Sequence, residues 1–426
     1  MENGSHGRQS IVVIGWVKFP FGSASASRLR TFAQGLVENG VSVHLITTSR
    51  IQYGTEGCKK NGVFEWNGIS YESTNVYDVT RERYSFLSRS VNLLLAIFRS
   101  WGRLHRLIVR GECTAVYIYG RSIVSYGPVA LIARLAGVPV IFDICEWFPT
   151  SKYRLAGLDP YFIDDYLGRQ LPRFLGDGVV AITSFIKKKY DGMKVQCILI
   201  PSLCDTNYCL NQGDTIKRSS VSEVFTLVYA GSCKPGDGFE DLLHAVKKVV
   251  AAGHPIRLHV VGTDGFTGWA ARHRQTCEKD SLLRESVRFL GRVSDDEYPV
   301  VLQSADCLVL PRPDNQIVRA AFPTRLPEFL SSGRPVLTTN VPDVPRYLES
   351  GVHAEIVDGN DGDALAQGIV RLLKNPDRAR KIGLAGQQRC REVFDYRPYI
   401  RILTEFVSTL TKKNIECRSS EYDNGQ

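Results

Sequence analysis

Short apolar runs alternate with longer amphipathic segments along most of this chain. The short runs are typical of buried parallel strands, and apolar residues spaced three or four positions apart are typical of the helices that cover them. A first helix is predicted at residues 25–39, and Asn67-Gly68 between two apolar runs predicts a small β-hairpin. The pattern indicates an α/β protein with a parallel sheet. In the first half of the chain the predicted strands lie at residues 11–15, 41–47, 115–119, 139–143, 178–182 and 196–200.

The same alternation starts again in the second half, after a polar stretch at residues 202–222 that we predict to be a linker. The elements expected there are strands at 224–231, 256–262 and 305–310 and helices at 238–252, 364–374 and 376–394. We therefore predict two tandem Rossmann-like, doubly wound domains, residues 1–201 and 223–395. Such domains in tandem are expected to face a central cleft that the carboxyl ends of their strands line. Residues 413–426 are polar, and we expect a disordered tail there.

Composition and charge narrow the choice of ligands and compartment. The 426 residues include 53 Lys and Arg against 44 Asp and Glu, and the net charge of +9 favours phosphate-bearing ligands or an anionic membrane surface. The 11 cysteines include no CxxC pair, so the sequence indicates neither a zinc site nor a thioredoxin motif, and we expect no metal. We see no signal-like segment and no apolar run of about 18 residues. We therefore expect a cytoplasmic protein, soluble or peripheral on the inner face of the membrane, with no nucleic-acid partner.

Polar residues follow two predicted strands of the first domain. Asp143 and Glu146 come at the end of the buried strand 139–143, and Arg121 follows the strand 115–119. Carboxyl ends of parallel strands line the ligand crevice of open α/β sheets, so these side chains are candidates for a site. The two carboxylates could orient a sugar hydroxyl or move a proton. They could equally be structural and paired with an arginine such as Arg121, and both interpretations stay open.

Loops of small residues follow the first strand of each predicted domain. Gly22 and Ser23 lie in the first of these loops, just before the helix 25–39. Small residues let the backbone approach a ligand closely, although a plain tight turn has the same composition. No GxGxxG pattern is present, which argues against a dehydrogenase. The loop at residues 231–238 contains three glycines before a helix and would suit a diphosphate.

Residues 320–337 form the most informative stretch, a proline-punctuated loop followed by a short helix and an apolar strand. Thr324 is a good N-cap for the helix, Glu328 lies near its first turn, and Gly333 ends it. The unpaired N–H groups at a helix start attract an anion, and Arg325 adds a cation on the same turn. We predict that this stretch holds phosphate.

A basic amphipathic helix is predicted at residues 88–110. Its apolar residues are Leu93, Leu94, Leu95, Ile97, Phe98, Trp101, Leu104 and Leu107, interleaved with Arg89, Arg99, Arg103, Arg106 and Arg110. A helix of this kind can lie on an anionic membrane surface. An ordinary helix that faces the core carries apolar residues at the same spacing, so both interpretations stay open.

With these motifs the chain resembles retaining glycosyltransferases of the GT-B fold, in particular those of family 4. The resemblance covers roughly residues 10–410 and is strongest at residues 322–336, followed by Asp343-Val344 and by residues 357–359. It implies a nucleotide diphosphate sugar as donor, a glycan or lipid-linked acceptor, and neither a cofactor nor an obligatory metal. It also implies that a helix at residues 396–412 crosses back onto the first domain, which would bind the acceptor.

The resemblance assigns roles to individual residues. Glu328 would hydrogen-bond the donor ribose, and Thr324 and Arg325 would lie beside the diphosphate. The other donor-site positions implied are Gly231, Ser232, Lys234, Arg292, Val293, Phe322 and Pro323. The acceptor-site candidates are Gly22, Ser23 and Arg121, and the catalytic candidates are Glu146, Asp143 and Arg325.

The chain departs from the family pattern at several positions. Ala320 stands where the family often has the first of two glutamates, eight positions before Glu328. Ser232 and Asp237 stand where many members carry Arg and Lys, and Cys145 stands where many have His. Lys234 or Arg325 would then have to balance the phosphate charge.

We therefore predict an enzyme that moves a sugar from a nucleotide diphosphate sugar to an acceptor hydroxyl with retention of configuration. Its product would belong to polysaccharide, glycolipid or other glycoconjugate biosynthesis. Two alternatives stay open, a nucleotide-sugar epimerase and a non-catalytic partner subunit that binds nucleotide.

Overall fold

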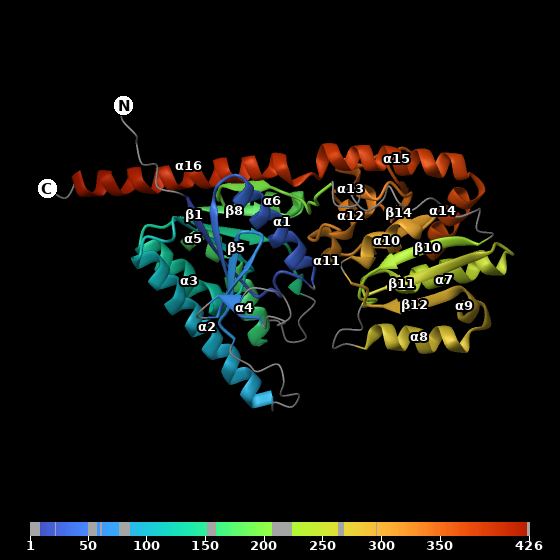
Figure 1. Ribbon diagram of the computed structural model, residues 1–426, viewed down its shortest axis with the longest axis horizontal. Helices are drawn as coiled ribbons and strands as arrows, with labels where there is room; N and C mark the ends of the chain where they lie inside the picture. The colour runs from blue at the N-terminus through green and yellow to red at the C-terminus, as the bar shows by residue number, and fades with distance from the viewer. Residues whose placement is uncertain are drawn as a thin grey trace. The chain divides into compact units, whose positions relative to one another are not determined.

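The computed structural model describes residues 9–21, 23–49, 58–59, 62–75, 86–150, 159–206, 224–262, 268–294 and 296–423. The chain divides into two compact units, which are drawn in Figure 1. The N-terminal unit combines Met1–Pro201 with Tyr396–Gln426, and the C-terminal unit comprises Ser202–Asp395.

A nine-stranded sheet forms the centre of the N-terminal unit, in the order β3-β4-β5-β2-β1-β6-β7-β8-β9. The strands are β1 (Ser10–Gly15), β2 (Ser42–Thr47), β3 (Cys58–Lys59), β4 (Val63–Trp66), β5 (Ile69–Ser73), β6 (Ala115–Tyr119), β7 (Val140–Ile144), β8 (Gly178–Ala181) and β9 (Cys197–Leu199). All neighbours from β5 to β9 pair in parallel. Residues 11–15 are buried without alternation because a parallel sheet is covered on both faces.

The predicted hairpin is confirmed. β4 and β5 pair antiparallel with Trp66 opposite Ile69, so the loop between them is Asn67-Gly68. Both loop residues have positive φ, 45° at Asn67 and 79° at Gly68. A two-residue turn of this type matches the twist of the flanking strands, and Asn-Gly is the pair that adopts it at least cost.

Helices cover this sheet (Figure 1). They are α1 (Ala24–Glu38), α2 (Phe86–Val109), α3 (Ile123–Leu135), α4 (Pro160–Gly168), α5 (Leu171–Leu175), α6 (Ser184–Gly192) and α16 (Tyr396–Asp423). α1 lies against β2 and β5, and α3 lies against β6 and β7. The strand order reverses between β1 and β6, and right-handed crossovers therefore place α1 and α3 on opposite faces. Ligands of open α/β sheets bind at such a reversal, beyond the carboxyl ends of the strands.

The C-terminal helix α16 packs on the N-terminal unit. Tyr396 donates its hydroxyl to Glu38 at 2.7 Å. A Cβ added at Gly35 of α1 would lie 2.4 Å from Ile400, and one at Gly178 would lie 2.5 Å from Phe406, so glycines at both positions allow the helix to come close. The helix continues through Asp423, and the expected disorder from residue 413 is therefore wrong for residues 413–423.

The C-terminal unit is built on a six-stranded parallel sheet in the order β12-β11-β10-β13-β14-β15. Its strands are β10 (Phe225–Ala230), β11 (Ile256–Val261), β12 (Val287–Gly291), β13 (Cys307–Leu310), β14 (Val336–Thr339) and β15 (Glu355–Val357). Its helices are α7 (Phe239–Ala251), α8 (Trp269–Lys279), α9 (Ser281–Ser286), α10 (Glu297–Ser304), α11 (Gln316–Arg319), α12 (Arg325–Ser331), α13 (Val344–Tyr347), α14 (Gly362–Lys374) and α15 (Pro376–Val393). The order reverses between β10 and β13, as in a doubly wound domain, and α7 packs against α14. The predicted fold class of two Rossmann-like domains is confirmed.

The stretch predicted as a linker is only partly described. Residues 202–206 belong to the C-terminal unit, where the backbone at Cys204 forms an isolated parallel β-bridge with the backbone at Asp395. Residues 207–222 lie outside the described residues.

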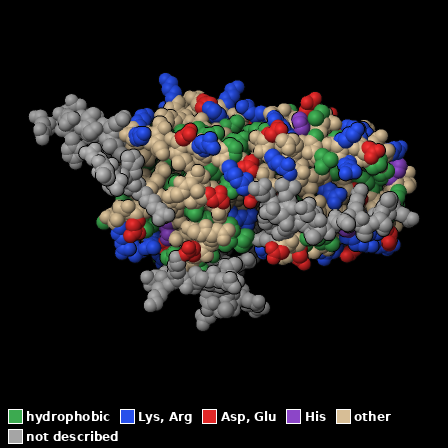
Figure 2. All heavy atoms as spheres, turned by 45° about the horizontal axis from the view of Figure 1, so that its top comes forward, with side chains coloured by type: hydrophobic (Ala, Val, Ile, Leu, Met, Phe, Trp, Pro, Cys, Tyr) green, Lys and Arg blue, Asp and Glu red, His purple; other side chains and the backbone are tan. Residues whose placement is uncertain are grey.

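The described surface carries both signs of charge. On the face drawn in Figure 2, basic and acidic side chains are interspersed over both units. Among the described residues drawn on that face, no single basic stripe of the kind found on nucleic-acid-binding proteins stands out. Within the described ranges, no helix combines the length and the apolar character needed to cross a bilayer.

Candidate functional site

The strand reversal of the C-terminal unit positions the first group of candidate residues. The loop 231–238 leaves β10, and Pro311-Arg312 leaves the neighbouring strand β13. The loop glycines allow close backbone packing inside the unit. A Cβ at Gly238, whose φ is +73°, would lie 1.4 Å from the Pro311 carbonyl oxygen, and one at Gly262 would lie 2.0 Å from the Gly231 oxygen. Packing thus explains these two close approaches, and a role of Gly231 at a diphosphate stays a prediction.

Asp237 is the centre of a polar cluster in this loop. The Ser232 hydroxyl donates to Asp237 Oδ2 at 2.9 Å, and the Lys234 backbone N–H donates to the same oxygen at 3.2 Å. Arg312 Nη1 approaches Asp237 Oδ1 at 3.5 Å. The two family departures, Ser232 and Asp237, therefore bind each other, while the Lys234 residue is exposed.

Arg312 is a further candidate, which was not predicted from the sequence. Its side chain is about one quarter accessible, with a relative exposure of 23%, and its Nε is buried with no hydrogen-bond partner among the described residues. It follows β13 directly and stands at the strand reversal, where ligands of this fold class bind. The available signal was an arginine between two prolines at the carboxyl end of a predicted buried strand.

The helix α12 brings Arg325 and Glu328 together. Arg325 Nη1 donates to Glu328 Oε2 at 2.7 Å, and the Tyr298 hydroxyl lies 3.4 Å from the same oxygen. The Arg325 guanidinium also lies over the Tyr298 ring, 5.0 Å from its centroid. Attraction to Tyr298 first, and to Glu328 second, raises the pKa of Arg325. The cation is therefore permanent and already oriented by two side chains, each partly accessible.

The loop before α12 differs from the prediction in one detail. Thr324 occupies the N-cap position as expected, but its backbone is helical and its side chain makes no cap hydrogen bond. Phe322 is buried, and the centroid of its ring lies 5.6 Å from that of Tyr347 and 5.7 Å from that of Phe394. Pro323 is buried as well. The side chains of Phe322 and Pro323 therefore shape the loop from inside, and only their backbone could face a donor.

Two other positions of the C-terminal unit complete this group. Arg292 and Val293 follow β12, and Arg292 is exposed while Val293 is half-buried. Ala320 is fully buried, so position 320, where the resemblance led us to note a missing glutamate, packs the interior of the unit.

In the N-terminal unit, Asp143 lies in a buried ion pair, which favours the structural interpretation of this residue over the catalytic one. Its side chain has no solvent exposure, and Arg28 Nε and Nη2 donate to its two oxygens at 2.9 Å each. Arg28 also donates to the carbonyl oxygens of Ile200 and Pro201 at 3.2 and 2.8 Å. Burial by itself would lower the pKa of Arg28, but attraction to Asp143 raises it, so Arg28 keeps its positive charge in this buried site. The geometry is that of the structural alternative for Asp143, with Arg28 as its partner in place of Arg121, and a catalytic role of Asp143 stays a prediction.

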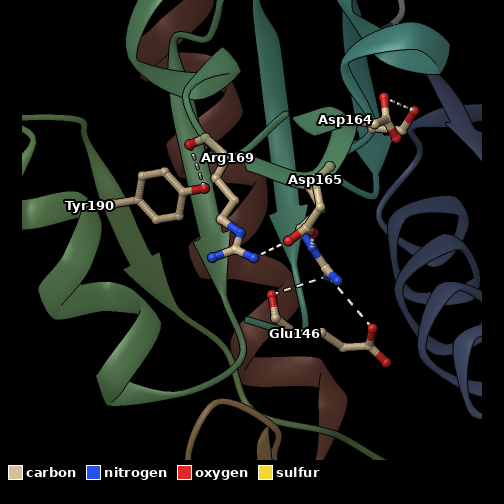
Figure 3. Close-up of polar contacts among 7 residues, drawn as sticks. Glu146, Asp164, Asp165, Arg169 and Tyr190 are labelled. Atoms are coloured by element: carbon tan, nitrogen blue, oxygen red, sulfur yellow. Dashed lines mark hydrogen bonds and ion pairs between the residues drawn. The ribbon is translucent and has the colours of Figure 1, made fainter. Parts of the chain in front are cut away.

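Glu146 lies at the open end of a second network, shown in Figure 3. Its carboxylate is 3.5 Å from Arg121 Nη1, and the same nitrogen donates to the Glu146 carbonyl oxygen at 3.2 Å. Arg121 also binds Asp165 through Nε, and Asp165 in turn binds Arg169. The Glu146 side chain is 55% exposed, so it can reach a ligand while Arg121 limits its movement.

Aromatic rings support this network. The Arg121 guanidinium lies 4.4 Å from the centroid of the Phe148 ring, and that of Arg169 lies 4.9 Å from the Trp147 ring. Tyr190 donates its hydroxyl to the Arg169 carbonyl oxygen at 3.2 Å (Figure 3). Arg121 and Glu146 are among the residues predicted from the sequence, whereas Asp165, which binds Arg121, and Arg169, which binds Asp165, are not.

The remaining acceptor candidates lie at the start of α1. Ser23 is the N-cap of α1, and its exposed side chain accepts the Ala26 N–H at 3.1 Å. Gly22 lies outside the described residues. Over the described part of the chain, no group of three or more His, Cys, Asp or Glu side chains is arranged to hold a metal ion.

Comparison with known proteins identifies relatives of both units. The family model described as glycosyl transferases group 1 matches residues 224–375. A phosphatidyl-myo-inositol mannosyltransferase of Mycobacterium leprae is 28% identical over 158 residues, which cover 37% of this chain and 39% of that protein. A GDP-mannose-dependent alpha-(1-6)-phosphatidylinositol monomannoside mannosyltransferase of Mycobacterium tuberculosis is 24% identical over 302 residues, 67% of this chain and 73% of that protein. The chain thus matches less than half of the length of the first of these relatives.

Solved structures share the fold over nearly the whole chain. A sucrose-phosphate synthase from Thermosynechococcus elongatus superimposes with a TM-score of 0.69 at 16% identity, over 95% of this chain and 100% of that one. Anabaena Alr3699/HepE in complex with UDP and glucose gives a TM-score of 0.64 at 14% identity, over 97% and 100%. At these identities the likeness establishes the two-domain fold.

Proposed function

We propose that this chain is a glycosyltransferase with the GT-B fold and of the family 4-like type. In this proposal it moves a sugar from a nucleotide diphosphate sugar to an acceptor hydroxyl. One observation carries the proposal above the others. The group 1 match at residues 224–375 contains the oriented pair of Arg325 and Glu328 on α12 and the polar cluster around Asp237 at the strand reversal. The product would be a glycolipid, polysaccharide or other glycoconjugate.

In this proposal the C-terminal unit binds the donor. Glu328 accepts hydrogen bonds from the ribose hydroxyls, and the backbone at Arg292 and Val293 contacts the base. Arg325 and Arg312 compensate the charge of the diphosphate, since the Ser232–Asp237 pair carries no cation of its own. Charge develops on the departing diphosphate in the transition state, and cations that are already oriented stabilise it without reorganisation.

The acceptor would bind to the N-terminal unit. Glu146, limited in its movement by Arg121, is the group placed to orient the acceptor hydroxyl or to receive its proton. Ser23 is the further acceptor contact. We include retention of configuration and independence from metal ions in the proposal, because the resemblance to family 4 implies both.

Donor turnover tests this proposal. UDP-glucose and GDP-mannose are the first donors to try, because the names of HepE complexes and of the Mycobacterium tuberculosis relative mention them. Each donor is incubated with no acceptor, with phosphatidylinositol and with a soluble oligosaccharide. Transfer only in the presence of an acceptor supports the proposal, conversion of the donor alone would indicate the epimerase, and binding without turnover of any donor would indicate the non-catalytic subunit.

Two variants and two measurements sharpen the result. Glu328→Gln is expected to weaken binding of the nucleoside diphosphate by about 1.5–3 kcal/mol in calorimetry, since a charge-assisted hydrogen bond is lost. Glu240→Gln, at an exposed position of α7, is the matched control and is expected to bind as the wild type does. The anomeric configuration of the product, read by NMR, tests retention, and activity after treatment with EDTA tests metal independence.

We also propose that the N-terminal unit binds an anionic membrane surface through α2. The helix has two apolar faces. Ile97, Leu104 and Leu107 are buried, whereas Leu94 and Phe98 on the opposite side are 50% and 56% exposed. Val91, Leu95 and Val109 are exposed as well, and so is Leu93, although Leu93 lies on the same face as Leu104. The two interpretations left open by the sequence thus apply to two different faces of one helix.

Charge favours a lipid surface as the partner of the exposed face. Residues 86–109 contain no Asp or Glu, and Arg99, Arg106 and Arg110 are exposed beside the apolar face. Arg103 is different, because it pairs with Glu72 of β5 at 2.6 Å and is not available. Each basic residue near an anionic leaflet contributes about 1 kcal/mol, so the three arginines add about 3 kcal/mol to whatever the exposed apolar side chains contribute by burial in the lipid.

Co-sedimentation with vesicles tests this partner. Phosphatidylglycerol vesicles are expected to bind the protein more strongly than phosphatidylcholine vesicles, with the difference shrinking as salt screens the charges. The double variant Arg99→Glu, Arg106→Glu is expected to lose the preference. Arg401→Glu, at an exposed position of α16, is the matched control. Equal binding of neutral and anionic vesicles would contradict the proposal.

A further inference from the structure

Two buried thiols lie in contact close to where the chain passes between its two units. Cys204 Sγ and Cys390 Sγ are 3.7 Å apart. Cys204 comes shortly after Pro201, where the chain leaves the N-terminal unit, and Cys390 comes shortly before Asp395, where it leaves the C-terminal unit. A backbone hydrogen bond joins the two segments, since the Cys204 N–H donates to the Phe394 carbonyl oxygen at 3.1 Å.

Cys390 also contacts the helix of the proposed donor site. Its thiol donates to the Pro327 carbonyl oxygen at 3.3 Å, and Pro327 precedes Glu328 in α12. One turn earlier on α15, Gln387 donates to the Ser331 carbonyl oxygen at 2.8 Å. α12 is therefore attached to α15 by two side-chain hydrogen bonds, and one of them requires the proton of the Cys390 thiol.

We propose that Cys204 and Cys390 form a reversible disulfide when a peroxide oxidises them, and that this modification loosens α12. The loosening would weaken donor binding, a consequence that rests on the proposed function. In a disulfide the sulfurs are about 2.05 Å apart, so they must approach each other from 3.7 Å. Cys390 then loses both its position and its proton, and the hydrogen bond to Pro327 is lost.

The chemistry balances with hydrogen peroxide as the oxidant. Cys204 is 8% exposed and Cys390 is not exposed at all, so Cys204 reacts first. Its thiolate attacks one peroxide oxygen, the O–O bond breaks, and hydroxide leaves, which gives a sulfenic acid. The Cys390 sulfur then attacks the Cys204 sulfur, the S–O bond breaks, and hydroxide leaves as Cys390 gives up its proton. Two thiols and one peroxide thus yield one disulfide and two waters.

Peptide mapping and hydrogen exchange of the full chain test both halves of the proposal. After a pulse of hydrogen peroxide, alkylation and digestion without reductant, the peptides that contain Cys204 and Cys390 are expected to be cross-linked, and dithiothreitol is expected to release them. Amide exchange of α12 is expected to speed up by about two- to tenfold, the change that corresponds to one lost neutral hydrogen bond. Neither measurement depends on sugar transfer, so a failed transferase assay and a failed redox test are distinguishable.

Three variants make the result specific. Cys204→Ala keeps the hydrogen bond from Cys390 to Pro327, and α12 is expected to exchange slowly with or without peroxide. Cys390→Ala is expected to exchange faster even in the reduced state. Cys197→Ala, on β9 of the other unit, is the matched control and is expected to form the cross-link as the wild type does. Separate alkylation of both peptides after peroxide, a cross-link that leaves α12 exchange unchanged, or a peroxide response in Cys204→Ala would each overturn the proposal.

Discussion

Replacing Asp143 by Asn tests whether the buried ion pair is structural. The substitution keeps the shape of the side chain but leaves the Arg28 cation in a site where both side chains have at most 2% exposure. Arg28 donates two hydrogen bonds to Asp143 and two to backbone carbonyls, so it has no way to turn toward water without breaking four contacts. Removing one partner of a buried pair costs about 3–5 kcal/mol, because the charge that remains is uncompensated.

That cost converts into a measurable change of melting temperature. In a domain of 150–250 residues, 1 kcal/mol corresponds to about 2–4 °C, so the transition of the N-terminal unit is expected to fall by about 6–20 °C. Differential scanning calorimetry is the appropriate assay because it resolves the two units if they unfold separately. Glu146→Gln is the matched control, since the Glu146 side chain is 55% exposed and surface changes usually stay within about 0.5 kcal/mol.

A double replacement separates a structural role from a catalytic one. Arg28→Met with Asp143→Leu removes both charges and is expected to recover most of the lost stability, because an apolar pair of similar volume is often neutral or stabilising. The reasoning is refuted if Asp143→Asn melts within 1 °C of the wild type while sugar transfer is abolished. That outcome would return Asp143 to the catalytic residues.

Burial of Glu72 would raise its pKa, but hydrogen bonds from His44 and Arg103 lower the pKa below the ordinary glutamate value, so this group stabilises the fold above its unfolded pKa and loses that effect as pH falls through the folded value. Glu72→Gln is therefore expected to lower the melting temperature at pH 7, with a difference from the wild type that closes in a fluorescence melt as pH falls through the lowered pKa of Glu72; a difference that widens in acid would contradict this. Arg312→Ala is expected to weaken the binding of a nucleoside diphosphate by about 1.5–3 kcal/mol in calorimetry and to leave the binding of the nucleoside unchanged. An equal loss of affinity for both ligands would show that Arg312 acts only by supporting the loop 231–238. Arg325→Ala is expected to weaken the binding of both the nucleoside diphosphate and the nucleoside, because Arg325 also orients Glu328. A loss of affinity confined to the nucleoside diphosphate would show that Glu328 does not need Arg325 to orient it.

Features fixed by neighbouring residues could be predicted from the sequence. The Asn67-Gly68 hairpin depends on two residues that accept positive φ, and the parallel strands depend on apolar runs that no alternation interrupts. Thr324 occupies the predicted N-cap position, but its side chain does not form the hydrogen bond that is typical of an N-cap. The chain is already helical at that residue, whereas an N-cap hydroxyl that accepts an N–H sits on extended backbone.

Partners distant in sequence could not be predicted. Asp143 meets Arg28 across 115 positions, and Arg121 meets Asp165 across 44. Nothing in the local pattern distinguishes these arginines from others nearby, because strand order decides which residues meet. The same limit applies to α2. The sequence shows that apolar residues surround much of the helix, but only the packed sheet shows that Leu104 is covered and that Phe98 is not.

The charge at the proposed donor site illustrates how strand order changes a conclusion about chemistry. The resemblance implies that Ser232 and Asp237 stand where many members of the family carry cations, which leaves Lys234 as the basic side chain of this loop. In the structure Asp237 accepts from Ser232 and approaches Arg312, 75 positions further along, because β13 lies beside β10. Asp237 thus acts as the support of a cation that comes from the neighbouring strand. The site would retain the positive charge of Arg312 at the strand reversal, and the position of that charge would depend on the Asp237 carboxylate. From the sequence alone, the same carboxylate is expected only to repel a diphosphate.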